Sequence, residues 1–185
     1  LKSLDASRNS KITTVNHLQQ LKTLKAEHGC GINDTGIMQC TNLKSLIASY
    51  NSKITTVNNL MHLETLEASY ECGINDAGLK QCINLKSLDA YSNPKITNVN
   101  HLAKLKKLHA VGDTCGINDD GIIQCTNLEY LNASYNPKIT NVNHLVKLKY
   151  LYAQGNCGID AAGIIQCINL KFVDASINRK MYKIY

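Results

Sequence analysis

One short pattern occurs nine times along the chain. Residues 1–6, LKSLDA, return as LKTLKA from Leu21, and further copies follow at alternating spacings of 20 and 22 residues with one step of 23. The nine copies begin at residues 1, 21, 43, 63, 85, 105, 128, 148 and 170. A fixed period of this length is typical of a solenoid, in which every repeat forms the same structural unit. Positions that recur therefore hold the scaffold, and positions that vary are free to recognise a partner.

The repeat predicts one short β-strand in each copy. Counted from its first residue, each repeat has leucine at positions 1 and 4, with Val173 as the exception at position 4, and alanine at position 6. Positions 4 and 6 alternate with variable residues at 3, 5 and 7, and this period of two marks a strand with one buried face. Strands that all run the same way give a parallel sheet with right-handed crossovers.

The pattern Leu-x-x-Leu-x-(Leu)-x-x-Asn/Cys resembles the leucine-rich repeat over nearly the whole chain. The odd repeats carry the asparagine that in this family satisfies backbone groups of the neighbouring turn: Asn9, Asn51, Asn93, Asn136 and Asn178. The even repeats, for example residues 74–79 (INDAGL), resemble the cysteine-containing repeats of F-box substrate adaptors, although alanine replaces leucine at position 6 and the cysteine lies one place late. The Asn-, Lys-, Ile- and Tyr-rich composition also resembles repeat proteins of giant amoeba viruses.

The resemblance implies an α/β solenoid, a right-handed leucine-rich-repeat horseshoe with a parallel sheet of about nine strands on its concave side. Eight strand spacings of roughly 4.8 Å give a stack about 38 Å long. Alanine at position 6 removes three carbons from every layer, and protein interiors do not tolerate such voids. We therefore expect a thin coil whose convex side carries short 3₁₀ or one-turn helices. Return segments rich in Asn, Asp and Thr suit such turns.

Residues 1–185 are expected to form a single leucine-rich-repeat domain that is a fragment of a longer chain, because the first repeat starts at Leu1 without an initiator methionine. No apolar run approaches the roughly 20 residues of a membrane span, and we expect no signal peptide, since the first residues already belong to a repeat. We expect no membrane partner. Solenoids need polar terminal repeats, so we also expect edge-to-edge self-association of the fragment.

The eight cysteines lie in the even repeats and form two columns, Cys30, Cys72, Cys115 and Cys157 in one and Cys40, Cys82, Cys125 and Cys167 in the other. Members of one column are two repeats, roughly 9.6 Å, apart, which is too far for a disulfide. We expect buried free thiols and a cytoplasmic or other reducing compartment, which would be the host cell cytoplasm for a viral protein. A disulfide framework and a metal site are the alternatives, but the spacing Cys-x9-Cys is not a zinc pattern.

No catalytic constellation recurs along the repeats. His28 lies close to Cys30, but tyrosine and glycine replace this histidine in the repeats that begin at residues 63 and 148. A Cys/His nucleophile needs both partners in place. We therefore expect no enzyme activity and no cofactor.

Lysines form two rows, at position 2 and position 11 of the repeats. These rows suit a solvated rim that resists association, attraction of an acidic partner, or nucleic-acid binding. Four acidic residues lie among them: Glu64, Glu67, Glu71 and Glu129. Their negative charge argues against nucleic acid.

The variable positions 3, 5, 7 and 8 predict a recognition surface on the concave face. Seven of the nine tyrosines and the single phenylalanine fall there: Tyr50, Tyr70, Tyr91, Tyr130, Tyr135, Tyr150, Tyr152 and Phe172. Position 3 is Ser, Thr or Lys in the first six repeats, so the scaffold does not require aromatics, and tyrosine is enriched at binding hot spots. We expect Tyr130, Tyr150 and Phe172 to stack on three consecutive strands.

A polar border of Lys107, His109 and Asp174 is expected around this aromatic patch. The sequence thus predicts a non-enzymatic module that binds a protein partner. A leucine-rich-repeat segment of a larger substrate adaptor or host-interaction protein is the alternative. The patch could instead be an aromatic ladder that only stiffens the sheet.

Overall fold

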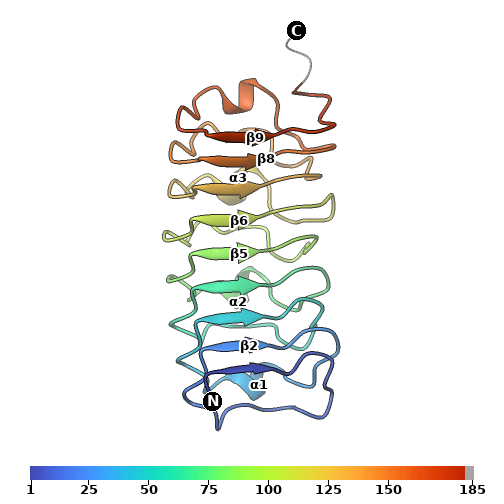
Figure 1. Cartoon of the computed structure of the whole chain (residues 1–185), viewed down its shortest axis with the longest axis vertical. Helices are drawn as coiled ribbons and strands as arrows, with labels where there is room; N and C mark the ends of the chain where they lie inside the picture. Colours follow the sequence, from blue (N-terminus) through green and yellow to red (C-terminus); the bar gives the residue numbers. More distant parts are fainter. Residues whose placement is uncertain (182–185) are drawn as a thin grey trace.

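The computed structural model describes residues 1–181, which wind into a coil with one strand per repeat (Figure 1). The strands are β1 (Ser3–Asp5), β2 (Thr23–Lys25), β3 (Ser45–Ile47), β4 (Thr65–Glu67), β5 (Ser87–Asp89), β6 (Lys107–His109), β7 (Tyr130–Asn132), β8 (Tyr150–Tyr152) and β9 (Phe172–Asp174). They form one nine-stranded sheet in sequence order, and every neighbouring pair is parallel. Equivalent positions face each other, as Leu4 faces Leu24. The predicted leucine-rich-repeat solenoid is confirmed.

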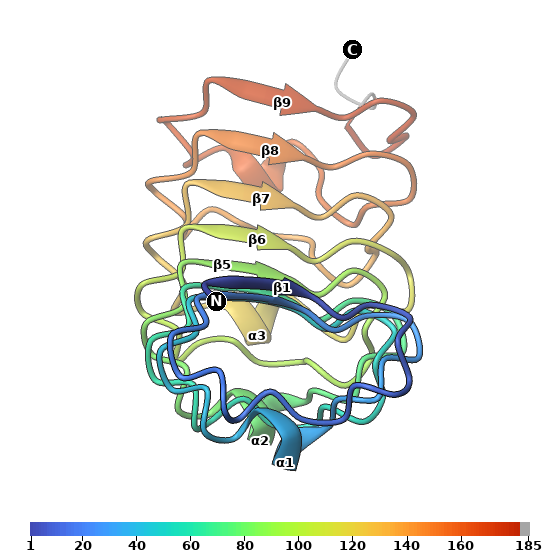
Figure 2. The same cartoon turned by 60° about the horizontal axis from the view of Figure 1, so that its bottom comes forward.

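The side of the coil opposite the sheet carries only very short helices (Figure 2). These are α1 (Asp34–Ile37), α2 (Asp76–Leu79), α3 (Asp119–Ile122) and the 3₁₀ turn η1 (Ala162–Ile164), all in even repeats. Each α-helix starts at an asparagine cap, such as Asn33, whose side-chain oxygen accepts a hydrogen bond from the Gly36 N–H at 3.0 Å. Within residues 1–181, the odd repeats return without a helix. The prediction of one-turn helices on this side is correct.

Leucine and alanine fill the space between the two sides. In the inner repeats the leucines at positions 1 and 4 and the alanine at position 6 are fully buried. The outermost turns are more open, since Leu1 is 69% and Val173 is 37% exposed. The edge-to-edge self-association that the sequence suggests stays a prediction.

A buried asparagine joins each odd repeat to the even repeat before it. The Asn93 side-chain nitrogen donates to the Ala68 carbonyl at 2.7 Å and to the Ile74 carbonyl at 3.3 Å. Its oxygen accepts from the Lys95 N–H at 2.9 Å. The same three bonds recur at Asn51, Asn136 and Asn178. The side chain thus satisfies backbone groups that would otherwise be buried without partners.

We expect the substitution Asn93→Ala to destabilise the fold by about 2–4 kcal/mol, because it leaves two buried carbonyls and one N–H without this partner. Asn9→Ala is the matched control, since Asn9 is exposed and its side chain bonds only the Lys11 N–H. Urea unfolding of the two variants measures the difference. Similar losses in both variants would show that the inter-repeat bonds do not carry the effect.

Candidate protein-binding face

Two rows of aromatic rings lie on the outer face of the sheet. The first, called here the exit row, contains His28, Tyr50, Tyr70 and Tyr91 from four consecutive repeats. Its ring centroids are 4.5, 4.3 and 4.8 Å apart, and the first two contacts are stacked. The rings lie where strands β2 to β5 end, so the row follows the stacking direction of the solenoid.

The second, called here the strand row, contains His109, Tyr130, Tyr152 and Phe172 on strands β6 to β9. Its centroids are 5.1, 5.4 and 5.2 Å apart with tilted planes. The Lys107 ammonium lies 5.0 Å from the centre of the Tyr130 ring, within the range of a cation–π interaction. One row therefore covers the N-terminal half of the face and the other the C-terminal half.

The rings in the strand row do not stack in the predicted order. Tyr130, Tyr150 and Phe172 are in register on adjacent strands, as expected. The Tyr130 ring nevertheless contacts Tyr152, and Tyr152 contacts Phe172. Long aromatic side chains can reach diagonal neighbours on a sheet, and the row alternates between positions 5 and 3. Tyr150 lies outside both rows and is 44% exposed.

The residues predicted as a polar border have different surroundings. His109 is the first ring of the strand row, and Lys107 lies over Tyr130. Asp174 accepts hydrogen bonds from the Gln154 amide at 2.7 Å and the Ser176 hydroxyl at 2.6 Å, which lower its pKa. Tyr135 lies at the strand exit against Gly155, and it is 44% exposed.

The exit row depends on an unusual backbone conformation. Position 8 has a positive φ in all nine repeats, with seven non-glycine residues there: Arg8, His28, Tyr50, Tyr70, Ser92, Tyr135 and Ile177. Glycine occupies it in the other two, as Gly112 and Gly155. Bulky residues rarely adopt this region. Two glycines at one repeat position were the signal by which the sequence could have revealed this bend.

Acidic side chains lie among the rings of the N-terminal half. Burial raises the pKa of the Glu67 carboxyl, and the negative charges of Asp89 and Glu27 raise it further. Asp89 accepts from the Ser69 hydroxyl at 2.9 Å and from the Tyr91 N–H at 2.9 Å. Burial lowers the pKa of His109, the nearby Lys107 lowers it further, and the neighbouring Asp89 opposes this shift.

The position-2 lysines are partly neutralised by two glutamates. Glu64 accepts from Lys44 at 3.0 Å and from Lys86 at 2.6 Å, and these bonds hold its pKa at about 2. Glu129 lies between Lys106 at 3.1 Å and Lys149 at 2.6 Å, and its pKa is also about 2. The sequence pattern shows that these glutamates interrupt the lysine row, but it does not reveal that each one bridges two lysines.

The position-11 lysines are engaged with the backbone. Lys53, Lys95 and Lys138 each donate from Nζ to the carbonyl of a cysteine in the preceding repeat, at 3.3, 3.3 and 2.7 Å. Lys180 donates to the Gly158 carbonyl at 3.4 Å. This row therefore helps to join repeats.

All eight cysteines are buried and unpaired. Members of the second column donate from Sγ to a valine carbonyl in the preceding repeat, for example Cys125 to Val99 at 3.5 Å. Burial raises the pKa values of Cys72, Cys82, Cys115 and Cys125 to about 11, so the thiols stay protonated at neutral pH. Within residues 1–181, no three potential metal-ligating side chains gather at one place.

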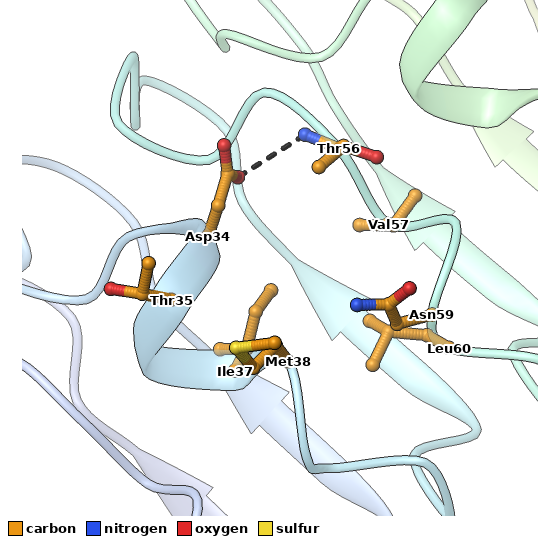
Figure 3. A pocket seen from close by; sticks show the side chains of 8 residues that line it. All are labelled: Asp34, Thr35, Ile37, Met38, Thr56, Val57, Asn59 and Leu60. Atoms are coloured by element: carbon orange, nitrogen blue, oxygen red, sulfur yellow. Dashed lines mark hydrogen bonds between the residues drawn. The ribbon is translucent and has the colours of Figure 1, made fainter.

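A cavity of about 150 Å³ lies on the opposite side of the coil, next to α1 (Figure 3). Its rim includes Asp34, which accepts from the Thr56 N–H at 3.2 Å. Asn59 also lines it. In two later repeats a histidine replaces this asparagine, and Nε2 of His101 and of His144 lies 3.1 Å from a helix carbonyl. The cavity is explained by the shorter side chain of Asn59, so it needs no ligand.

The chain is similar in structure to leucine-rich-repeat proteins. It matches internalin C2 of Listeria monocytogenes with a TM-score of 0.70 and 24% identity, covering 94% of this chain and 80% of that one. The functional domain of InlJ from the same organism, described as including a cysteine ladder, matches with a TM-score of 0.62 and 22% identity. This match covers 96% of this chain and 44% of the InlJ chain. The mouse RP105/MD-1 complex matches with a TM-score of 0.56 and 18% identity, covering 85% of this chain and 30% of the matched chain.

These similarities establish the fold, and the chain spans less than half of the InlJ domain. No protein-family model matches the chain, and no curated protein has a matching sequence. The structural matches named above give no support to the giant-virus resemblance. Among residues 1–181, no helix has the length and apolar character needed to cross a membrane.

The two bridging glutamates predict a pH dependence of stability. Their pKa values of about 2 lie below the ordinary 4.5, so Glu64 and Glu129 stabilise the fold above about pH 4.5 and lose this effect as the pH falls towards 2. In urea unfolding, the native protein should lose stability over this range more steeply than the double variant E64Q/E129Q. High salt should reduce the difference, because both carboxylates are solvent-accessible. Parallel pH profiles would contradict the assignment.

Proposed function

We propose that this chain is a non-enzymatic module that binds a protein partner on the outer face of its sheet. The observation that carries the proposal is the pair of aromatic rows on that face. Scaffold requirements explain the buried leucines, alanines and asparagines, but they do not explain tyrosine at strand exits with positive φ. The bend itself recurs in all nine repeats and belongs to the scaffold, whereas the tyrosines placed on it do not recur in all of them.

The chemistry of the face suits protein recognition. Tyrosine offers a large, rigid contact area and is enriched at interface hot spots. Tyr50, Tyr135, Tyr150 and Phe172 are between 37% and 44% exposed, so they retain apolar surface to bury. Charged side chains at the edges, such as Lys107 and Asp174, supply a polar rim. RP105, which has a similar fold, is seen in complex with the protein MD-1, which supports this use of the architecture.

We also propose that residues 1–185 are one leucine-rich-repeat domain of a longer protein, in which the array is the segment that selects a substrate or a host target. A flanking F-box or other domain in the complete gene would distinguish an adaptor from a stand-alone binder. Attraction of nucleic acid or an acidic partner to the lysine rows is a weaker proposal. Glu64, Glu129 and the backbone carbonyls already engage many of these lysines.

We expect Y150A/Y152A to weaken partner binding by about 2–4 kcal/mol, because both side chains would lose buried interface area. Three baits are compared in parallel: the native protein, Y150A/Y152A and the control T23A, which alters position 3 outside both rows. Some proteins should bind the native and T23A baits but not Y150A/Y152A. Calorimetry then measures the affinity of each such protein for the three baits. If the double variant binds normally and melts much earlier, the strand row is a stiffening ladder and the proposal fails.

We further propose that the protein works in the cytoplasm or another reducing compartment, since its eight thiols are buried and unpaired. The denatured protein, purified without reductant, should therefore titrate close to eight free thiols. Buried cysteines in the native state should react slowly, because only the thiolate is nucleophilic. A titration of four or fewer thiols before reduction would indicate an oxidising compartment instead.

A further inference from the structure

The exit row is interrupted at the sixth repeat. Rings follow one another from His28 to Tyr91, but position 8 of the sixth repeat is Gly112, and an aromatic ring returns only at Tyr135. A hollow of about 470 Å³ lies at this interruption, next to Gly112. Its lining residues are Tyr91, Ser92, Gly112, Asp113, Tyr135 and Asn156.

The hollow is bordered by two aromatic rings. Tyr91 comes from the repeat before Gly112 and Tyr135 from the repeat after it, and both line the hollow. The Tyr135 ring also lies against Gly155. A planar group at Gly112 would therefore have one aromatic ring in each neighbouring repeat. Gly112, with a φ of +97°, has no side chain, and it therefore leaves the sixth repeat without a ring at position 8.

The charge of the hollow selects a cation. Asp113 is exposed, and it takes part in none of the ion pairs among residues 1–181. No lysine, arginine or histidine lines the hollow, whereas Asn156, Ser92 and the two tyrosines offer oxygen atoms. Asp89, which faces Glu67 across two strands, accepts a hydrogen bond from the Tyr91 N–H at 2.9 Å.

We propose that this hollow binds an arginine side chain of the protein partner, with the guanidinium stacked between Tyr91 and Tyr135 and paired with Asp113. Arginine is planar and stacks on aromatic faces, whereas the lysine ammonium is a compact, strongly hydrated charge. An uncharged aromatic side chain would fill the space but would leave Asp113 without a partner. The inference rests on the proposed function and names the chemistry that the partner must bring.

The test uses the blocked tripeptide acetyl-Gly-Arg-Gly-amide as the probe, with the lysine and tyrosine versions for comparison. Titration into the ¹⁵N-labelled protein should shift the Gly112 amide resonance saturably in the millimolar range. The arginine peptide should bind more tightly than the other two. D113N should weaken its binding about three- to fivefold, and Y135A should also weaken it.

The matched control is E71Q, which removes an acidic side chain at the equivalent position 9 of the fourth repeat, away from the hollow. It should leave the affinity for the arginine peptide unchanged. The inference is overturned if Gly112 shows no saturable shift, if the tyrosine peptide binds more tightly than the arginine peptide, or if D113N and E71Q behave alike. The tripeptide needs no protein partner, so this failure is distinct from a failure of the Y150A/Y152A bait comparison.

Discussion

The buried asparagine that bonds two carbonyls of the preceding repeat fixes the register on which the rest of the molecule depends. A strand alternates its side chains between two faces, so a slip of one residue would expose every leucine and bury every ring. Asn93 holds one side of the coil, and Asp76 holds the other by accepting from the Thr97 N–H at 2.8 Å and from its hydroxyl. The asparagine bonds recur in four odd repeats and the aspartate bonds in three even repeats, and they keep equivalent positions aligned along the stack.

This alignment turns a local backbone bend into a continuous surface. A residue with positive φ at position 8 costs about 1–2 kcal/mol when it is not glycine, and seven repeats accept that cost. The scaffold bonds on both sides of the bend make it tolerable, and stacking between Tyr50 and Tyr70 offsets part of it. Glycine would be the least strained choice in all nine repeats. The aromatic side chains at this position are therefore better explained by recognition than by folding.

The sequence predicted the scaffold because the scaffold is what repeats. Leucine at position 1 and leucine or, in the ninth repeat, valine at position 4 identified every strand, and the ladder asparagines identified the joints between repeats. The ring contacts could not be predicted in the same way, since they join different positions. Tyr91 at position 7 continues a row of position-8 residues, and Tyr152 at position 5 joins residues at position 3. Side-chain rotamers decide such diagonal contacts, and repeat numbering carries no information about them.

The positions of the charged side chains show why the net charge of the protein is a poor guide to its partner. The net charge of +6 suggests an acidic target, but the lysines at position 11 donate to carbonyls and several at position 2 are bridged by glutamates. The acidic groups are placed differently: Glu67 and Asp89 lie beside each other among the rings, and Asp113 lies at the interruption of the exit row. Like charges held together on a partly buried face repel one another, and a cationic partner would relieve this repulsion. These acidic groups are the basis for the proposal that the ring-bearing face binds a basic group, although the protein as a whole is basic.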